Sequence, residues 1–132
     1  MTDMTETGDE RDPLTHQIIG AAMEVHREMG PGLLESVYQK CLARELKRQG
    51  VICQLQSRLP LVYKGEVLDD DYFILDVFFP GQLVVELKAV EKLLPIHEAQ
   101  LLTYLRLSKT RVGQLINFNV RLLKDGIKRM VL

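Results

Sequence analysis

The feature that most constrains this sequence is a pair of apolar segments, joined by a short turn and interrupted by three charged residues. Residues 74–79 and 83–89 are rich in Val, Ile, Leu and Phe, which predicts two β-strands, and Pro80-Gly81 predicts a hairpin loop between them. Strands this apolar are typical of a sheet that is covered on both faces. Burying a charge in such a strand is costly unless the charge is paired or binds a metal. The charged residues are therefore candidates for a functional site.

The three charged residues are Asp76, Glu86 and Lys88, and their spacing predicts that they meet. Side chains alternate across a strand, so Glu86 and Lys88 lie on one face. A three-residue loop, 80–82, sets a register in which Asp76 faces Glu86, with Cβ atoms about 4.5–5.5 Å apart. The other face of the same two strands is wholly apolar.

Two alternatives explain such a cluster. Two carboxylates this close repel one another when both are ionised, and a divalent cation removes that penalty. Hard oxygen ligands suit Mg²⁺ or Mn²⁺, and such an ion activates water and neutralises charge on a phosphate, while Lys88 orients the water. The other alternative is a buried ion-pair triad that holds no metal.

The rest of the chain predicts an α/β domain, with α+β as the alternative, in which helices flank one mixed sheet. Apolar residues recur at helical spacing over 14–29 and from about 34 to 49, and a third helix is expected over 96–107. Further strands are expected in four segments: 51–56, 59–63, 112–119 and the end of 122–132. The predicted order is two helices, four strands, a helix and two strands.

The ends of the chain and its cysteines set the expected organisation. Residues 1–12 are acidic and without periodicity, so we expect a disordered tail before one domain over 13–132. Removing the one basic and five acidic residues of 1–12 from the 17 and 18 of the whole chain leaves 16 basic and 13 acidic residues. This excess is too small to identify a polyanionic ligand.

Cys41 and Cys53 are the only cysteines, and their spacing is not that of a zinc site. A reduced, cytoplasmic protein is the simplest setting for them. No apolar run approaches the roughly 18–20 residues that span a membrane, so no membrane partner is expected.

Two motifs accompany the charged cluster. Gly32, Glu35 and Tyr38 spell G-x-x-E-x-x-Y at the start of the second helix, and Gln100 and Tyr104 spell Q-x-x-x-Y on the third. An acid near a helix N-terminus is stabilising in itself, so Glu35 has a structural as well as a functional reading. Tyr38 belongs to an apolar stripe and is expected to pack in the core with its hydroxyl bonded. Gln100 and Tyr104 have an ordinary amphipathic helix as their alternative reading.

These residues resemble those of a known superfamily. Asp76 followed by Glu86-x-Lys88 resembles the core of the PD-(D/E)XK nucleases, although Leu75 stands where that name has proline. G-x-x-E-x-x-Y looks like the signature of the GxxExxY protein family, a branch of that superfamily, and Q-x-x-x-Y is similar to an element of RecB-like nucleases. The resemblance runs from residue 14 to 132 and includes three further segments: VVELKAV, HEAQLLTYLR and LINFNVRLLKDGIKR.

The resemblance implies a restriction-endonuclease-like core and a Mg²⁺- or Mn²⁺-dependent hydrolase acting on phosphodiester bonds of DNA or RNA. The site residues that it implies are Glu35, Asp76, Glu86, Lys88, Gln100 and Tyr104. The first three are the implied metal ligands, and Lys88 is implied to assist hydrolysis. The alternative function is a catalytically inactive module on a nuclease fold, which binds nucleic acid or a protein. The small size of the chain favours a homodimer.

The remaining polar candidates are expected to be structural or solvated. His26 and His97 are expected to be structural, and Asp69–Asp71 to form a solvated loop, with an outer metal ligand as the alternative. Five basic residues of the first two helices are candidates for phosphate contacts, although a solvated face is the default: Arg27, Lys40, Arg44, Lys47 and Arg48.

Overall fold

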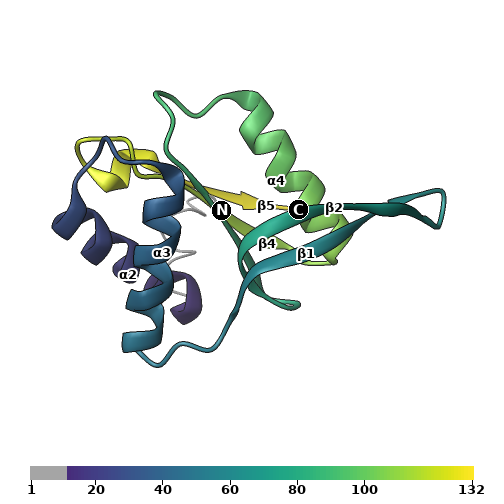
Figure 1. Ribbon diagram of the computed structural model, residues 1–132, viewed down its shortest axis with the longest axis horizontal. Helices are drawn as coiled ribbons and strands as arrows, with labels where there is room; N and C mark the ends of the chain where they lie inside the picture. Colours follow the sequence, from purple (N-terminus) through teal and green to yellow (C-terminus); the bar gives the residue numbers. More distant parts are fainter. Residues whose placement is uncertain (1–11) are drawn as a thin grey trace.

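A five-stranded mixed sheet with helices on both faces organises the computed structural model, which describes residues 12–132 (Figure 1). The helices are α2 (Pro13–Met29), α3 (Glu35–Arg48) and α4 (Pro95–Ser108). The strands are β1 (Gln54–Tyr63), β2 (Glu66–Phe79), β3 (Leu83–Lys88), β4 (Val112–Asn117) and β5 (Ile127–Val131), with the short 3-10 helix η1 (Leu123–Gly126) before the last. They lie in the order β1-β2-β3-β4-β5, and β3 and β4 are the one parallel pair. The expected α/β architecture with one mixed sheet is confirmed; the expected tail lies outside the described residues except for Asp12.

The first helix begins and ends where its sequence signals lie. Asp12 caps α2, because its carboxylate accepts hydrogen bonds from the backbone N–H and the hydroxyl of Thr15, and Pro13 opens the first turn. Gly30 ends the helix at a φ of 71°, a conformation that glycine adopts without strain. The turn that follows leads into α3, so it decides where the first residue of α3 points.

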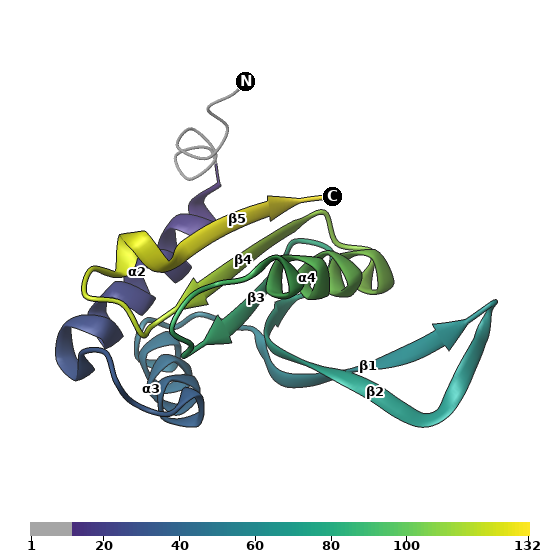
Figure 2. The same cartoon turned by 90° about the horizontal axis from the view of Figure 1, so that it is seen from above.

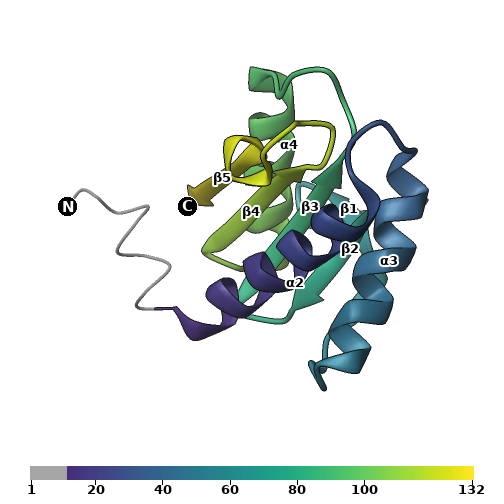
Figure 3. The ribbon, with the colours of Figure 1, turned by 90° about the vertical axis from the view of Figure 1, so that its left-hand side faces the viewer.

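The sheet separates two apolar clusters. Helices α2 and α3 cover one face, where residues such as Ile18 and Leu42 pack against Val85 and Leu87 (Figure 3). Helix α4 covers the opposite face, where Leu101 and Leu105 lie in one cluster with Val84. Because β3 is covered on both sides, its polar side chains lie in an interior rather than on a surface.

The hairpin of β2 and β3 has the predicted register but only a short ladder. Phe79 pairs with Leu83 and Val77 with Val85, after which the two strands separate at Asp76. Beyond that point β2 pairs only with β1, and the two form a long arm that projects from the rest of the sheet (Figure 2). The strands thus open a fork, and Asp76 lies at its base.

The structure corrects two details of this arm. The segments 51–56 and 59–63, expected as two strands, are parts of the single strand β1, so the sheet has five strands rather than six. Pro60 is tolerated because β1 is an edge strand, and a register shift follows it at Val62. The run Asp69–Asp71 lies within β2 and not in a loop; its side chains are exposed on the arm, where charge remains solvated.

Two further findings concern the chain as a whole. Across residues 12–132, no helix has both the length and the apolar character needed to cross a membrane. Cys41 and Cys53 are both unpaired.

Candidate active site

The carboxylate of Asp76 occupies the base of the fork between β2 and β3. Alternate N–H groups of a strand point to the same neighbour, so the N–H of Leu87 faces β2 at a position where the ladder has already ended. Asp76 Oδ2 accepts this N–H at 2.8 Å. Asp76 is only 5% exposed. Its carboxylate takes the place of the strand carbonyl that the N–H of Leu87 lacks, and this bond fixes the side chain of Asp76.

Two glutamine amides hold the other oxygen of Asp76. Gln39 Nε2, from α3, donates to Asp76 Oδ1 at 2.9 Å, and Gln56 Nε2, from β1, donates to the same oxygen at 3.2 Å. Gln39 Nε2 also donates to Glu35 Oε2 at 3.0 Å, so one amide bridges the two acids. Glu35, the first residue of α3, is thereby brought to the site as expected.

Glu86 and Lys88 lie on the same face of β3 and form an ion pair. Lys88 Nζ lies 3.2 Å from Glu86 Oε2, and the two side chains are 14% and 8% exposed. The other oxygen, Glu86 Oε1, is buried without a hydrogen-bond partner. An unpartnered buried carboxylate oxygen is costly, so a cation or a hydrogen-bond donor at this oxygen would stabilise the site.

The acids of this cluster perturb one another. Burial, and then the charge of Asp76, raise the pKa of Glu86 to about 8. Burial also raises the pKa of Asp76 although the N–H of Leu87 opposes the rise, and burial followed by the charge of Asp76 raises the pKa of Glu35. Mutual repulsion among buried carboxylates is typical of sites that recruit positive charge.

Helix α4 brings Tyr104 towards the acids but leaves Gln100 in solvent. Tyr104 is 8% exposed and packs on Phe73 with ring centroids 5.0 Å apart. Burial raises the pKa of Tyr104 to about 12, and the charges of Glu86, Asp76 and Glu35 add to the rise. The phenol therefore keeps its proton at neutral pH. Gln100 is exposed and makes no side-chain hydrogen bond to any residue of 12–132.

Three residues weighed as site candidates have structural roles. Tyr38 is fully buried, stacks on Phe118 at a centroid distance of 4.5 Å, and bonds through its hydroxyl, as expected. The Nε2 atom of His26 lies 2.7 Å from the carbonyl oxygen of Val120. His97 Nδ1 accepts the N–H of Leu94 and so caps the start of α4. Both histidines are structural, as the sequence predicts.

Tyr38 links the core to the turn that positions Glu35, which gives a first prediction. Its hydroxyl donates to the carbonyl of Gly30 at 2.6 Å and accepts the N–H of Leu33 at 3.2 Å. Tyr38→Phe keeps the stacked ring and removes both bonds, so we expect it to lower the free energy of unfolding by about 1 kcal/mol in urea denaturation. The control is Tyr63→Phe, at a side chain that is 61% exposed. Equal stability of the two variants would contradict the role of this hydroxyl.

The donor chemistry of the site fits a hard divalent cation, although the side chains do not enclose one as placed. Among residues 12–132, no group of three or more His, Cys, Asp and Glu side chains is arranged to hold a metal ion. Lys88 takes one oxygen of Glu86, and amides take one oxygen of Asp76. The unpartnered oxygen of Glu86 and its raised pKa nevertheless indicate that further positive charge would stabilise the ionised form of this carboxyl. Asp76, Glu86 and Glu35 are the residues that could hold a cation.

Sequence reasoning missed two residues of the site, Gln39 and Gln56. Gln39 lies one helical turn after Glu35, so its position on the same face of α3 could have been found from the spacing. Gln56 reaches Asp76 from a strand residue with a φ of 50°, and no sequence signal marks that conformation.

A cavity of about 310 Å³ opens beside Asp76. Its lining comes from α3, β1, β2 and β3 and includes Gln39, Lys40 and Gln56. Asp76 is therefore buried but adjoins a space that a ligand can enter.

Comparison with known proteins agrees with this geometry. A family model described as the PD-(D/E)XK nuclease superfamily matches residues 12–130. The searches of curated proteins and of solved structures gave no match.

Proposed function

The chain belongs to the PD-(D/E)XK nuclease superfamily, and we propose that its acidic site hydrolyses nucleic-acid phosphodiester bonds with a bound Mg²⁺ or Mn²⁺. One observation carries the proposal: burial and the charge of Asp76 raise the pKa of Glu86 to about 8, beside Lys88 and with one Glu86 oxygen unpartnered. The ionised form of Glu86 therefore has a demand for further positive charge. Members of this superfamily generally use divalent metals, which fits that demand.

In this proposal Asp76, Glu86 and Glu35 hold the cation, which supplies an activated water and neutralises charge on the phosphate. Asp76 has the most fixed position, because the N–H of Leu87 and two amides orient it. Glu86 offers its unpartnered oxygen without breaking a contact. Glu35 is half-buried at the first position of α3, and Gln39 donates to its Oε2 at 3.0 Å.

Lys88 has the proposed role of orienting water and stabilising the transition state. Its ammonium lies beside Glu86 at the inner end of the site, and its side chain is 14% exposed. With a cation bound to Glu86, the three N–H donors of Lys88 would be free to orient a water and to contact a phosphate oxygen.

Tyr104 and Gln100 are proposed to place the substrate. The phenol of Tyr104 is protonated at neutral pH, so it donates a hydrogen bond to a phosphate oxygen rather than repelling it. Gln100 lies one turn earlier on α4 and is exposed, so its amide is free to contact the nucleic-acid backbone.

We further infer that the chain falls in the GxxExxY branch, with a RecB-like Q-x-x-x-Y element. The geometry gives the first motif a physical meaning. Gly32 takes a φ of 94° in the turn, Glu35 opens α3 beside Asp76, and Tyr38 ties the turn to the core. The turn and its bonds to Tyr38 thus place the carboxylate of Glu35 at the site.

The proposal is tested by incubating the wild-type protein with plasmid DNA, single-stranded DNA and single-stranded RNA. We expect cleavage of at least one substrate with Mn²⁺ or Mg²⁺ and none in excess EDTA, because the acids need a cation to act on an anionic phosphate. Absence of metal-dependent cleavage on all three would contradict the proposed hydrolase.

An inactive nuclease-fold module is the competing function, and the Lys88–Glu86 ion pair favours it. In that reading Lys88 serves permanently as the counter-ion and no metal is recruited. It predicts nucleic-acid binding that EDTA does not affect and no uptake of Mn²⁺ in calorimetric titration. The expected homodimer stays a prediction, which light scattering tests.

A further inference from the structure

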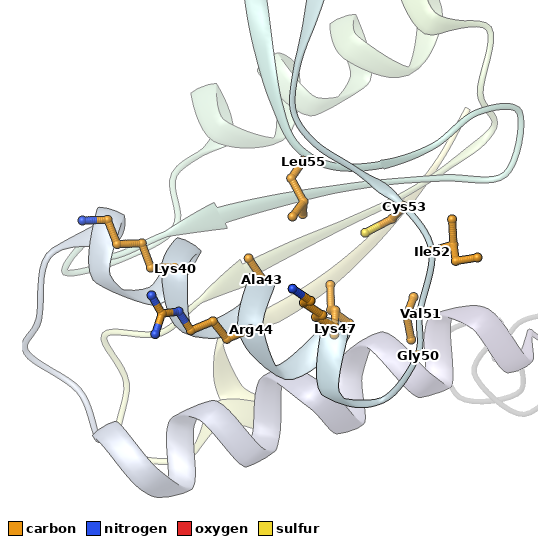
Figure 4. A pocket seen from close by; sticks show the side chains of 10 residues that line it. Lys40, Ala43, Arg44, Lys47, Gly50, Val51, Ile52, Cys53 and Leu55 are labelled. Carbon is orange, nitrogen blue, oxygen red and sulfur yellow. The ribbon is translucent and has the colours of Figure 1, made fainter.

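A groove runs from Asp76 along α3. A second cavity, of about 550 Å³, lies between α3 and the segment 50–55 (Figure 4). It shares three lining residues with the cavity beside Asp76: Lys40, Ala43 and Leu55. The two cavities are therefore neighbouring parts of one groove that begins at Asp76 of the candidate active site.

One wall of the groove is cationic. Lys40, Arg44 and Lys47 follow one another at helical spacing along α3, and all three are exposed. Within residues 12–132, none of them takes part in an ion pair. At 1.5 Å per residue they extend over about 10 Å along the helix.

The opposite wall is apolar. It is formed by the segment between α3 and β1 and by the first residues of β1, where Ile52 is 92% exposed and Leu55 is 44% exposed (Figure 4). Val51 and Cys53 complete it. The cations and the exposed apolar side chains that line the same cavity together fit a ligand that is anionic on one side and apolar on the other.

We propose that this groove binds a short segment of a single strand next to the bond that the site cleaves. The phosphates lie along Lys40, Arg44 and Lys47, and the faces of unstacked bases lie against Ile52 and Leu55. A duplex does not fit this division, because its base faces are buried in the stack and only its charged backbone would meet the apolar wall. The inference rests on the proposed function and names its substrate class as single-stranded nucleic acid.

Binding without cleavage tests the groove separately from the chemistry. In EDTA, the affinities for a fluorescein-labelled oligo-deoxythymidylate and for the same strand annealed to its complement are measured by anisotropy at several salt concentrations. The test variant is Arg44→Gln/Lys47→Gln, and the matched control is Arg121→Gln/Lys124→Gln, an exposed pair of the same charge near η1.

We expect the wild type to bind the single strand more tightly than the duplex. The Arg44→Gln/Lys47→Gln variant should bind it about tenfold more weakly, and its salt dependence should fall by about 1.4 in the log–log slope, while the control stays close to wild type. Ile52→Ser should weaken binding about fivefold with an unchanged salt slope, because it removes apolar contact and no charge.

Three results would overturn the proposed binding of a single strand in the groove. They are duplex binding as tight as single-strand binding, equal losses of affinity in the two double variants, and no binding of the single strand by the wild type. Each of them leaves the hydrolase proposal intact if the protein still cleaves a substrate with Mn²⁺. Loss of metal-dependent cleavage with single-strand binding preserved would instead count against the hydrolase alone.

Discussion

Replacing Lys88 with methionine is expected to slow metal-dependent cleavage roughly a hundred- to a thousandfold without weakening the binding of Mn²⁺. Methionine keeps an unbranched apolar stem and removes the ammonium that lies 3.2 Å from Glu86 Oε2. The lost donors can no longer orient water or stabilise charge on the phosphate. A bound cation also loses a like-charged neighbour, so the affinity for Mn²⁺ stays equal or becomes tighter. Single-turnover cleavage rates and calorimetric titration measure the two effects.

A matched control for this variant is Lys124→Met, at an exposed position of η1, which should leave both the cleavage rate and the metal affinity unchanged. A Lys88→Met protein that cleaves as fast as wild type removes Lys88 from the mechanism. Loss of Mn²⁺ binding in Lys88→Met would show that the ammonium has a structural role in the site, against the role proposed for it.

The face of the sheet that carries the site was predictable because strand periodicity leaves few choices. One face of the hairpin is apolar and packs against α2 and α3, through Val77, Leu83, Val85 and Leu87. Because side chains alternate along a strand, Glu86 must lie on the other face. The three-residue loop then sets the pairing of the hairpin. The register of the hairpin and the meeting of the charged residues both follow from this short segment, whereas the fold class follows from the pattern of helices and strands along the whole chain.

The separation of β2 from β3 was not predictable from the same segment. The sequence 66–75 contains both acids and apolar residues and gives no sign that the β1–β2 arm extends beyond the sheet. The separation leaves the N–H of Leu87 without a strand partner, which is why Asp76 Oδ2 accepts it and does not simply face Glu86. Register predicts which residues are neighbours; the curvature of a long arm decides how their side chains are oriented.

The last expected result concerns pH. In metal-free protein, burial and the charge of Asp76 raise the pKa of Glu86 from 4.5 to about 8. Between these values the folded state binds more protons than the unfolded state, so the free energy of unfolding falls as the pH rises. The stabilisation is complete below about pH 4.5 and is lost once the pH has passed about 8, an effect on the order of 4 kcal/mol.

Glu86→Gln replaces the titrating group by a neutral side chain of the same shape, so most of this decline should disappear. The raised pKa values of Asp76 and Glu35 act in the same direction and leave a smaller decline in the variant. Urea denaturation in EDTA at about pH 5, 7 and 9 measures it, with Glu66→Gln on the exposed arm as the control. If wild type and Glu86→Gln lost stability equally between pH 5 and pH 9, the buried carboxylate would already have its counter-charge, and the need for a metal ion would lose its physical basis.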